Sequence, residues 1–142
     1  MKRKSSMILI MLALAVLVWL ERSESTQVLL GPSSTVVADA FERQLSDIWV
    51  EGEGRVVRTL SDDNDGSRHQ RFVLEVGPEH TVLVAHNIDL APRINALRRG
   101  DEVRFVGEYV WNEQGGIIHW THHDPQSRHA GGWLEHDGQR YE

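Results

Sequence analysis

Cysteine is absent from the 142-residue sequence, which excludes disulfide bonds, a lipidated cysteine and thiolate chemistry. Lysine is nearly absent as well, because both lysines lie among the first four residues. From Glu21 onward, twelve arginines stand against twenty-one acidic residues, which gives a net charge of −9. An acidic balance of this size argues against a general nucleic-acid-binding protein, which would be basic. It leaves room for a local arginine patch, because a guanidinium holds planar anions through two parallel hydrogen bonds.

The sequence also lacks the short motifs of several enzyme classes. It has no Gly-x-Ser-x-Gly elbow, no phosphate-binding loop and no dinucleotide fingerprint, so nothing supports a serine hydrolase, a nucleotide triphosphatase or a Rossmann domain. The segment Ser61–Gly66 matches part of a calcium-binding loop. However, Ser61 occupies the first ligand position and Phe72 the twelfth, so the EF-hand pattern fails. A solvated turn is the better interpretation.

Only one long apolar run is present, Met7–Leu20, and it follows the basic residues Lys2–Lys4. At ~1.5 Å per residue, this run spans roughly 21 Å as a helix, short of a ~30 Å hydrocarbon core. Residues 1–22 are therefore either a signal peptide or a short uncleaved anchor, and we favour the anchor. The positive-inside rule keeps the basic end in the cytoplasm and exports the remainder. Residues 23–34 are polar and read as a linker.

Apolar periodicity predicts the elements of a domain over residues 35–142. Helical spacing predicts an amphipathic helix over 35–47. A second, short helix after Asn87 would bury Leu90, Ile94 and Leu97, and Gly100 would end it. An Asp-Gly pair at 137–138 predicts a C-terminal hairpin. Alternating apolar residues predict five strands, at Trp49–Leu60, Arg68–Val76, His80–His86, Glu102–Trp111 and Ile117–His122.

This order of elements predicts a mainly β fold with some helix, an OB-fold-like five-stranded barrel with one helix between strands three and four. Gly52 and Gly54 would bend the first strand, as barrel closure requires. The alternative is another small curved-sheet α+β domain. OB domains bind ligands on the face of strands two and three and through loops 1–2 and 4–5. We expect that face to carry His69, Arg71 and His86.

The segment Gly115–Pro125 is the strongest candidate for a functional site. Five of the eight histidines lie between His119 and His136, and three of them fall in this segment. If the fifth strand runs to His122, alternate side chains share a face roughly 6.5–7 Å apart. The candidate catalytic residues are His119, His122, Asp124 and His69.

Three interpretations of this histidine-rich site stay open. A divalent metal such as zinc accepts histidine ligands, and His86, His119, His122 and His123 are the candidates, although their spacing matches no established zinc motif. The histidines could instead serve metal-free acid–base chemistry or binding. In the third interpretation they only hydrogen-bond to backbone at the strand end, while Trp120 fills the core.

A second group of polar residues lies at the start of the second strand, with Arg68 and Arg71, and at the end of the third, with His86 and Asn87. As a site, its arginines and imidazole would hold an anion such as a phosphate; as structure, they would pair with neighbouring acids. Trp111, at the mouth of the hairpin loop 112–116, is the better candidate for stacking on a base or sugar, because Trp120 is expected in the core. The candidate ligand-binding residues are Arg68, Arg71, His86, Asn87, Trp111 and Thr121.

Three segments together resemble a known family: Gly66–Phe72, Ala85–Asp89 and Gly116–Pro125. They are similar to a family of small bacterial envelope proteins, marked by a His-Trp-Thr-His motif and known only as a domain of unknown function. The match covers about Val50–Tyr141. It implies a protein of the bacterial inner membrane with its domain facing the periplasm, or a periplasmic protein if the leader is cleaved. It implies no activity.

These observations favour an exported, membrane-tethered binding domain whose partners are the membrane, through the N-terminal segment, and an anionic or oligomeric ligand. Nucleic acid is compatible with such a site but is not favoured by the net charge. The alternative function is a histidine-ligated, metal-dependent phosphodiester hydrolase or nuclease of the envelope. A purely structural envelope partner is the third.

The topology generates the first testable prediction. Because the basic residues Lys2–Lys4 precede the apolar run, a reporter enzyme fused after Tyr141 should be active only in the exported compartment. Activity of the same fusion in the cytoplasm would overturn this orientation.

Overall fold

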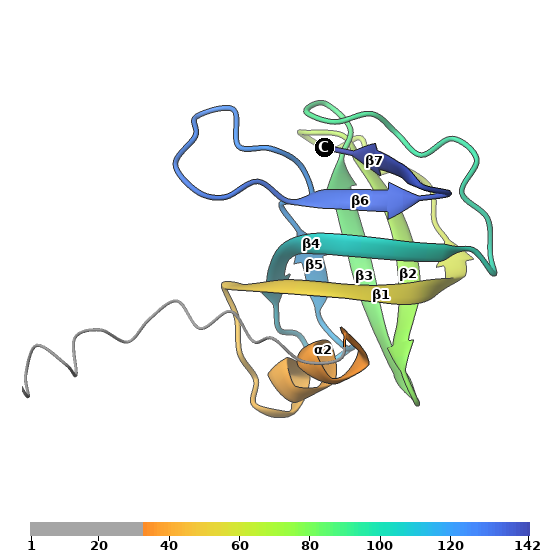
Figure 1. Cartoon of the computed structure of the whole chain (residues 1–142), viewed down its shortest axis with the longest axis vertical. Helices are drawn as coiled ribbons and strands as arrows, with labels where there is room; N and C mark the ends of the chain where they lie inside the picture. Colours follow the sequence, from red (N-terminus) through yellow and green to blue (C-terminus); the bar gives the residue numbers. More distant parts are fainter. Residues whose placement is uncertain (1–32) are drawn as a thin grey trace, which may run out of the picture.

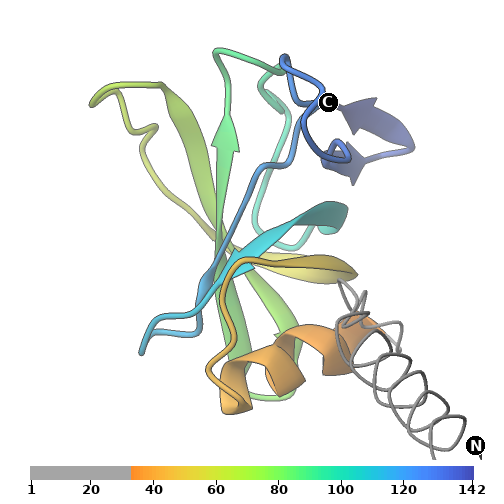
Figure 2. The same cartoon turned by 90° about the vertical axis from the view of Figure 1, so that its left-hand side faces the viewer.

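A computed structural model describes residues 33–142, so the predicted leader and most of the predicted linker lie outside the described residues. One helix and seven strands are assigned in this part of the chain (Figures 1 and 2). They are α2 (Ser33–Glu42), β1 (Ile48–Thr59), β2 (His69–Gly77), β3 (His80–Asn87), β4 (Glu102–Val110), β5 (Ile117–His119), β6 (Trp133–His136) and β7 (Gln139–Tyr141). No helix among the described residues is both long and apolar enough to cross a membrane.

Strands β1 to β5 close into a barrel. β1 pairs with β2 and β4, β2 pairs with β3, and β5 lies between β3 and β4. The β3–β5 pairing is parallel and the others are antiparallel. This is the predicted OB-like five-stranded barrel, and it closes between the third and fifth strands. The bulge in β1 falls between Val56 and Arg58, where the strand changes its register with β2.

The core follows the alternation that the sequence predicts. On β2, Phe72, Leu74 and Val76 are buried, and the residues between them face outward. Phe105 on β4 is fully buried and lies against β1 at Gly52, where an added Cβ would come within 2.6 Å of the Phe105 ring. Gly52 therefore serves close packing inside the barrel as well as curvature.

Helix α2 lies across one end of the barrel in both views (Figures 1 and 2). Its residues Val37 and Ala40 are fully buried, and Phe41 packs edge-on against His80 with 4.9 Å between the ring centroids. The helix ends at Glu42 rather than at the predicted residue 47. Gln44 has a φ of 53°, a left-handed backbone conformation that stops an α-helix.

The predicted helix between strands three and four is absent, because residues 88–101 form turns and extended segments. Ile94 is fully buried as predicted, but the buried Gln70 side chain holds it from inside the barrel. The Gln70 amide donates to the Ile94 carbonyl at 2.9 Å and accepts from the Ile94 N–H at 2.9 Å. A side chain thus takes the two backbone groups that a helix would use. Leu90, predicted in the buried stripe, is 37% exposed.

The fifth strand is also shorter than predicted, since it ends at His119 rather than at His122. Trp120 has a φ of 54°, so the chain leaves the extended conformation there and the alternation of faces stops. The alternate residues His119, Thr121 and His123, which would share a face in a longer strand, therefore do not do so. Thr121 and His122 are buried, whereas His123 is exposed.

The C-terminal hairpin of β6 and β7 is confirmed. Asp137 and Gly138 both have positive φ, at 51° and 75°, which is the two-residue turn predicted from the Asp-Gly pair. β6 pairs with residues Arg104–Val106 of β4, next to the segment of β4 that pairs with β5. The hairpin thus continues the barrel wall where β5 stops (Figure 1).

The core assignment yields the second prediction. Phe72→Ala or Phe105→Ala removes a fully buried ring and should lower the free energy of unfolding by ~3–5 kcal/mol. His69→Ala, on the outward face of β2, should cost less than ~1 kcal/mol. Chemical denaturation of the three variants measures these costs. A larger loss in His69→Ala than in the two phenylalanine variants would contradict the assigned faces.

Candidate functional site

His86 lies inside the barrel and connects two loops. Its position next to Gln70 in the β2–β3 register places it on the inward face, so it does not share a face with His69 and Arg71 as predicted. Its Nε2–H donates to the Pro92 carbonyl at 3.0 Å, and its Nδ1 accepts from the Thr121 hydroxyl at 2.8 Å. A carbonyl can only accept, which fixes this tautomer. Burial lowers the pKa of His86 from 6.5 to about 4, so the ring is neutral near pH 7.

The residues after Trp120 also use their polar atoms inside the structure. The His122 Nδ1–H donates to the His123 carbonyl at 2.7 Å, and burial is the main cause that lowers the pKa of His122. Asp124 has a side chain only 2% exposed. Its carboxylate accepts the backbone N–H groups of Gln126, Arg128 and His129. These donors, Gln126 first, hold the pKa of Asp124 below its usual range and make it the anchor of its loop.

The predicted metal ligands are dispersed. His86 points into the barrel and uses both ring nitrogens in hydrogen bonds, whereas His119 lies on the outer face and His123 is exposed. Over residues 33–142, no group of three or more His, Cys, Asp or Glu side chains is placed to hold a metal ion. His122 bonds to a backbone carbonyl, as the third interpretation expected, whereas His119 bonds to the side chain of Glu108.

The arginines predicted to hold an anion, Arg68 and Arg71, connect loops of the structure instead. Arg68 donates to Asp89 from its backbone N–H at 2.8 Å and from its Nε at 2.7 Å, and Asn87 accepts the Asp89 N–H. Arg71 donates from Nε and Nη2 to the Ser61 carbonyl, which fixes the turn after β1. The Arg68 donors hold the pKa of Asp89 below its usual range, with the backbone N–H first.

The two tryptophans lie in other places than predicted. Trp111 stacks on Phe41 of α2 at 6.3 Å, so it belongs to the packing between the helix and the barrel. Trp120 does not fill the core, a place that Ile118 takes. It is half-buried and meets the His129 ring edge-on at 4.5 Å. The left-handed backbone at Trp120 turns its side chain away from the barrel interior, which the strand pattern could not show.

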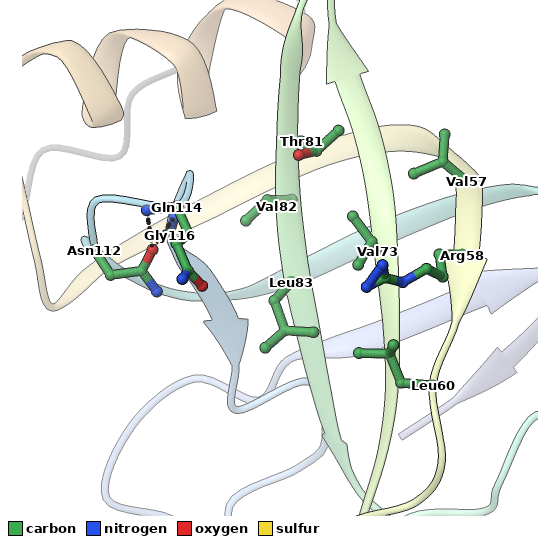
Figure 3. Close-up of a pocket in the computed structure, with 10 residues that line it drawn as sticks. All are labelled: Val57, Arg58, Leu60, Val73, Thr81, Val82, Leu83, Asn112, Gln114 and Gly116. Atoms are coloured by element: carbon green, nitrogen blue, oxygen red, sulfur yellow. Dashed lines mark hydrogen bonds between the residues drawn. The ribbon is translucent and has the colours of Figure 1, made fainter.

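A groove of about 450 Å³ lies on the outer face of β1, β2 and β3, beside the loop 112–116 (Figure 3). In Figure 3, β3 runs through the middle of the groove, with the loop on one side and the end of β1 on the other. Its lining residues are Val57, Arg58, Leu60, Val73, Thr81, Val82, Leu83, Asn112, Gln114 and Gly116. The groove lies on strands β2 and β3 and beside loop 4–5, where OB domains bind ligands, but none of the predicted ligand-binding residues lines it.

Three features shape this groove chemically. Its floor is aliphatic, because Val73 and Leu83 are opposed in the β2–β3 register and both are half-buried. Its loop is fixed, because the Asn112 side chain accepts the N–H groups of Gln114 and Gly116 at 2.8 and 3.0 Å. Arg58 is exposed at its rim, and no described carboxylate lies within ion-pair distance of it. The groove thus offers an apolar floor, an amide-rich loop and one available cation.

Sequence reasoning missed Arg58, Leu83 and Glu108. The signal for Leu83 was an aliphatic residue on a strand face that otherwise faces solvent. Glu108 is the cross-strand partner of His119 and hydrogen-bonds to it, with 3.0 Å between Oε1 and Nε2. The short hairpin loop 112–116 fixes which residues of β4 and β5 lie opposite each other. The pairing of Glu108 with His119 could therefore have been predicted from this register.

The sequence profile of a family described as "Protein of unknown function (DUF3465)" matches residues 19–142. No curated protein matches the sequence. The match covers the whole barrel, α2 and the C-terminal hairpin.

The buried His86 generates the third prediction. As the pH falls below ~6.5, His86 takes up a proton in the unfolded chain but not in the folded one, whose pKa is about 4. The neutral, buried His86 therefore makes its full contribution to the free energy of unfolding above pH ~6.5. As the pH falls toward 4, the free energy of unfolding decreases by up to about 3 kcal/mol. Denaturation of the wild type and of His86→Gln between pH 7 and pH 4.5 should show a flatter pH dependence in the variant. His122→Gln removes the other buried imidazole and shows how much of the pH dependence that ring causes. Equal slopes of stability against pH in the wild type and His86→Gln would refute the role of His86.

Proposed function

Because the chain belongs to the DUF3465 family, which has no assigned function, we propose from its geometry that it is an exported, membrane-tethered binding domain. Its ligand is anionic and elongated, with an aliphatic part that occupies the groove on β1, β2 and β3. The observation that supports this most is the coincidence of a groove of about 450 Å³ with the OB-fold ligand face. The basic Lys2–Lys4 and the apolar Met7–Leu20 support export and tethering.

The ligand class follows from the lining. The aliphatic Val57, Leu60, Val73 and Leu83 favour a hydrocarbon portion, and none of the ten lining residues is aromatic. A groove without aromatic side chains has no surface on which nucleobases stack, which is the usual source of single-strand binding in OB domains. The Arg58 guanidinium at the rim favours a phosphate, sulfate or carboxylate group at one end of the ligand.

A metal-dependent hydrolase has less support. In that function His86 and Asp124 would be ligands or bases. His86 already bonds through both ring nitrogens inside the barrel, and Asp124 accepts three backbone N–H groups of its own loop. Freeing either side chain would leave buried polar groups without partners.

The fourth prediction tests the groove with hexyl phosphate, which joins a short aliphatic chain to a single anionic group. Isothermal titration calorimetry on the full chain in detergent should detect binding, and Arg58→Gln should weaken it about tenfold, because a charge-assisted hydrogen bond is lost. Leu83→Asn places an amide on the apolar floor and should reduce the affinity at least as much.

Arg55→Gln is the matched control for this experiment. Arg55 lies on the same strand as Arg58, but it pairs with Glu102 at 3.1 Å and does not line the groove. The proposal requires the Arg55 variant to bind like the wild type. Equal affinity in all four proteins, or binding of hexanol as tight as that of hexyl phosphate, would contradict it.

A further inference from the structure

A second polar and aromatic surface lies on the other side of β1, where β1, β4 and β5 are adjacent. Trp49, Glu108 and His119 occupy neighbouring positions on these three strands, because Trp49 pairs with Glu108 and Glu108 pairs with His119. All three alternate with inward-facing neighbours, so their side chains stand on the outer face. None of them lines the groove on β1, β2 and β3.

Trp120 completes this surface. Its ring centroid lies 6.5 Å from that of His119 and 4.5 Å from that of His129. Trp49 lies 5.4 Å from the same His129 ring, so His129 separates the two indoles. Both tryptophans are half-buried rather than enclosed in the core. We call Trp49, Glu108, His119 and Trp120 the tryptophan–glutamate face.

The polar pair of this face has unused hydrogen-bonding capacity. The His119 Nε2 and the Glu108 Oε1 are 3.0 Å apart, which fixes the orientation of both side chains. Among the described residues, the other carboxylate oxygen of Glu108 and Nδ1 of His119 have no hydrogen-bond partner, and both side chains are partly exposed, at 22% and 37%. An ionised carboxylate only accepts, so it suits a ligand that supplies several hydroxyl donors.

The tryptophan–glutamate face therefore combines two surfaces that a sugar ring needs. A pyranose has an apolar face of C–H groups, which packs on an indole, and hydroxyl groups around its edge, which donate to carboxylate and imidazole acceptors. An anionic ligand is disfavoured here, because the Glu108 carboxylate stands at the centre of the face, between Trp49 and His119. We propose that the tryptophan–glutamate face binds a neutral glycan, with Trp49 and Trp120 as stacking residues and Glu108 and His119 as hydrogen-bonding residues.

The test uses three soluble neutral hexasaccharides, namely cellohexaose, maltohexaose and N-acetyl-chitohexaose. The full chain is kept in a polyoxyethylene detergent, which has no sugar headgroup, and binding is followed by tryptophan fluorescence and by calorimetry. At least one hexasaccharide should bind and change the tryptophan emission. Glu108→Gln keeps the shape of the side chain but loses the charge, and it should weaken binding about tenfold. Trp49→Leu should weaken it at least as much, without touching the left-handed backbone at Trp120.

Two controls make the outcome decisive. Trp111→Phe changes an indole that packs on Phe41 of α2 and is not part of this face, so the variant should bind like the wild type. Leu83→Asn disturbs the groove and should leave sugar binding unchanged, so this result is independent of the hexyl phosphate experiment. The proposal fails if none of the hexasaccharides binds the folded wild type. It also fails if Leu83→Asn or Trp111→Phe loses binding as Glu108→Gln does. Preferential binding of tetramethylammonium would identify a cation-binding aromatic site instead.

Discussion

The two hydrogen bonds of His86 determine the arrangement of the barrel end that carries the 88–101 loop. One neutral imidazole, buried at the end of β3, holds the 88–101 loop through Pro92 and the segment after β5 through Thr121. Gln70, its neighbour on β2, holds the same loop at Ile94. Because these buried polar groups are satisfied only in one arrangement, they specify where the long loop and the histidine-rich segment lie. The surface features around Trp120 follow from that placement.

The strands could be predicted from sequence because their signal is local. Phe72, Leu74 and Val76 alternate with polar residues, and the structure buries the same three side chains. The 88–101 loop could not be predicted in this way. Leu90, Ile94 and Leu97 have helical spacing, but the backbone groups of Ile94 are bonded to Gln70, more than twenty residues away in sequence. No local pattern encodes a competing partner at that distance.

The structure brings only some of the predicted site residues together. His86 on the third strand contacts the histidine-rich segment through Thr121. A positive φ at Trp120 rotates every later side chain relative to a strand, and a sequence gives little indication of it at a tryptophan. The lining of the groove could not be predicted for a different reason. Its lining comes from four separate segments, and its floor consists of Val73 and Leu83, which resemble ordinary strand residues.

The division of the β4 edge between two partners has a consequence for the order of folding. The segment near Tyr109 pairs with β5, and the segment near Phe105 pairs with β6, which lies almost at the end of the chain. β4 also pairs with β1 over its full length, so that Ile48 lies opposite Tyr109. Contacts of such long sequence separation form slowly, because a large loop must close before any of them is made. β5 precedes β6 in the chain, so the five-stranded barrel can close on β4 first, and the final hairpin then extends its wall along the remaining part of the β4 edge.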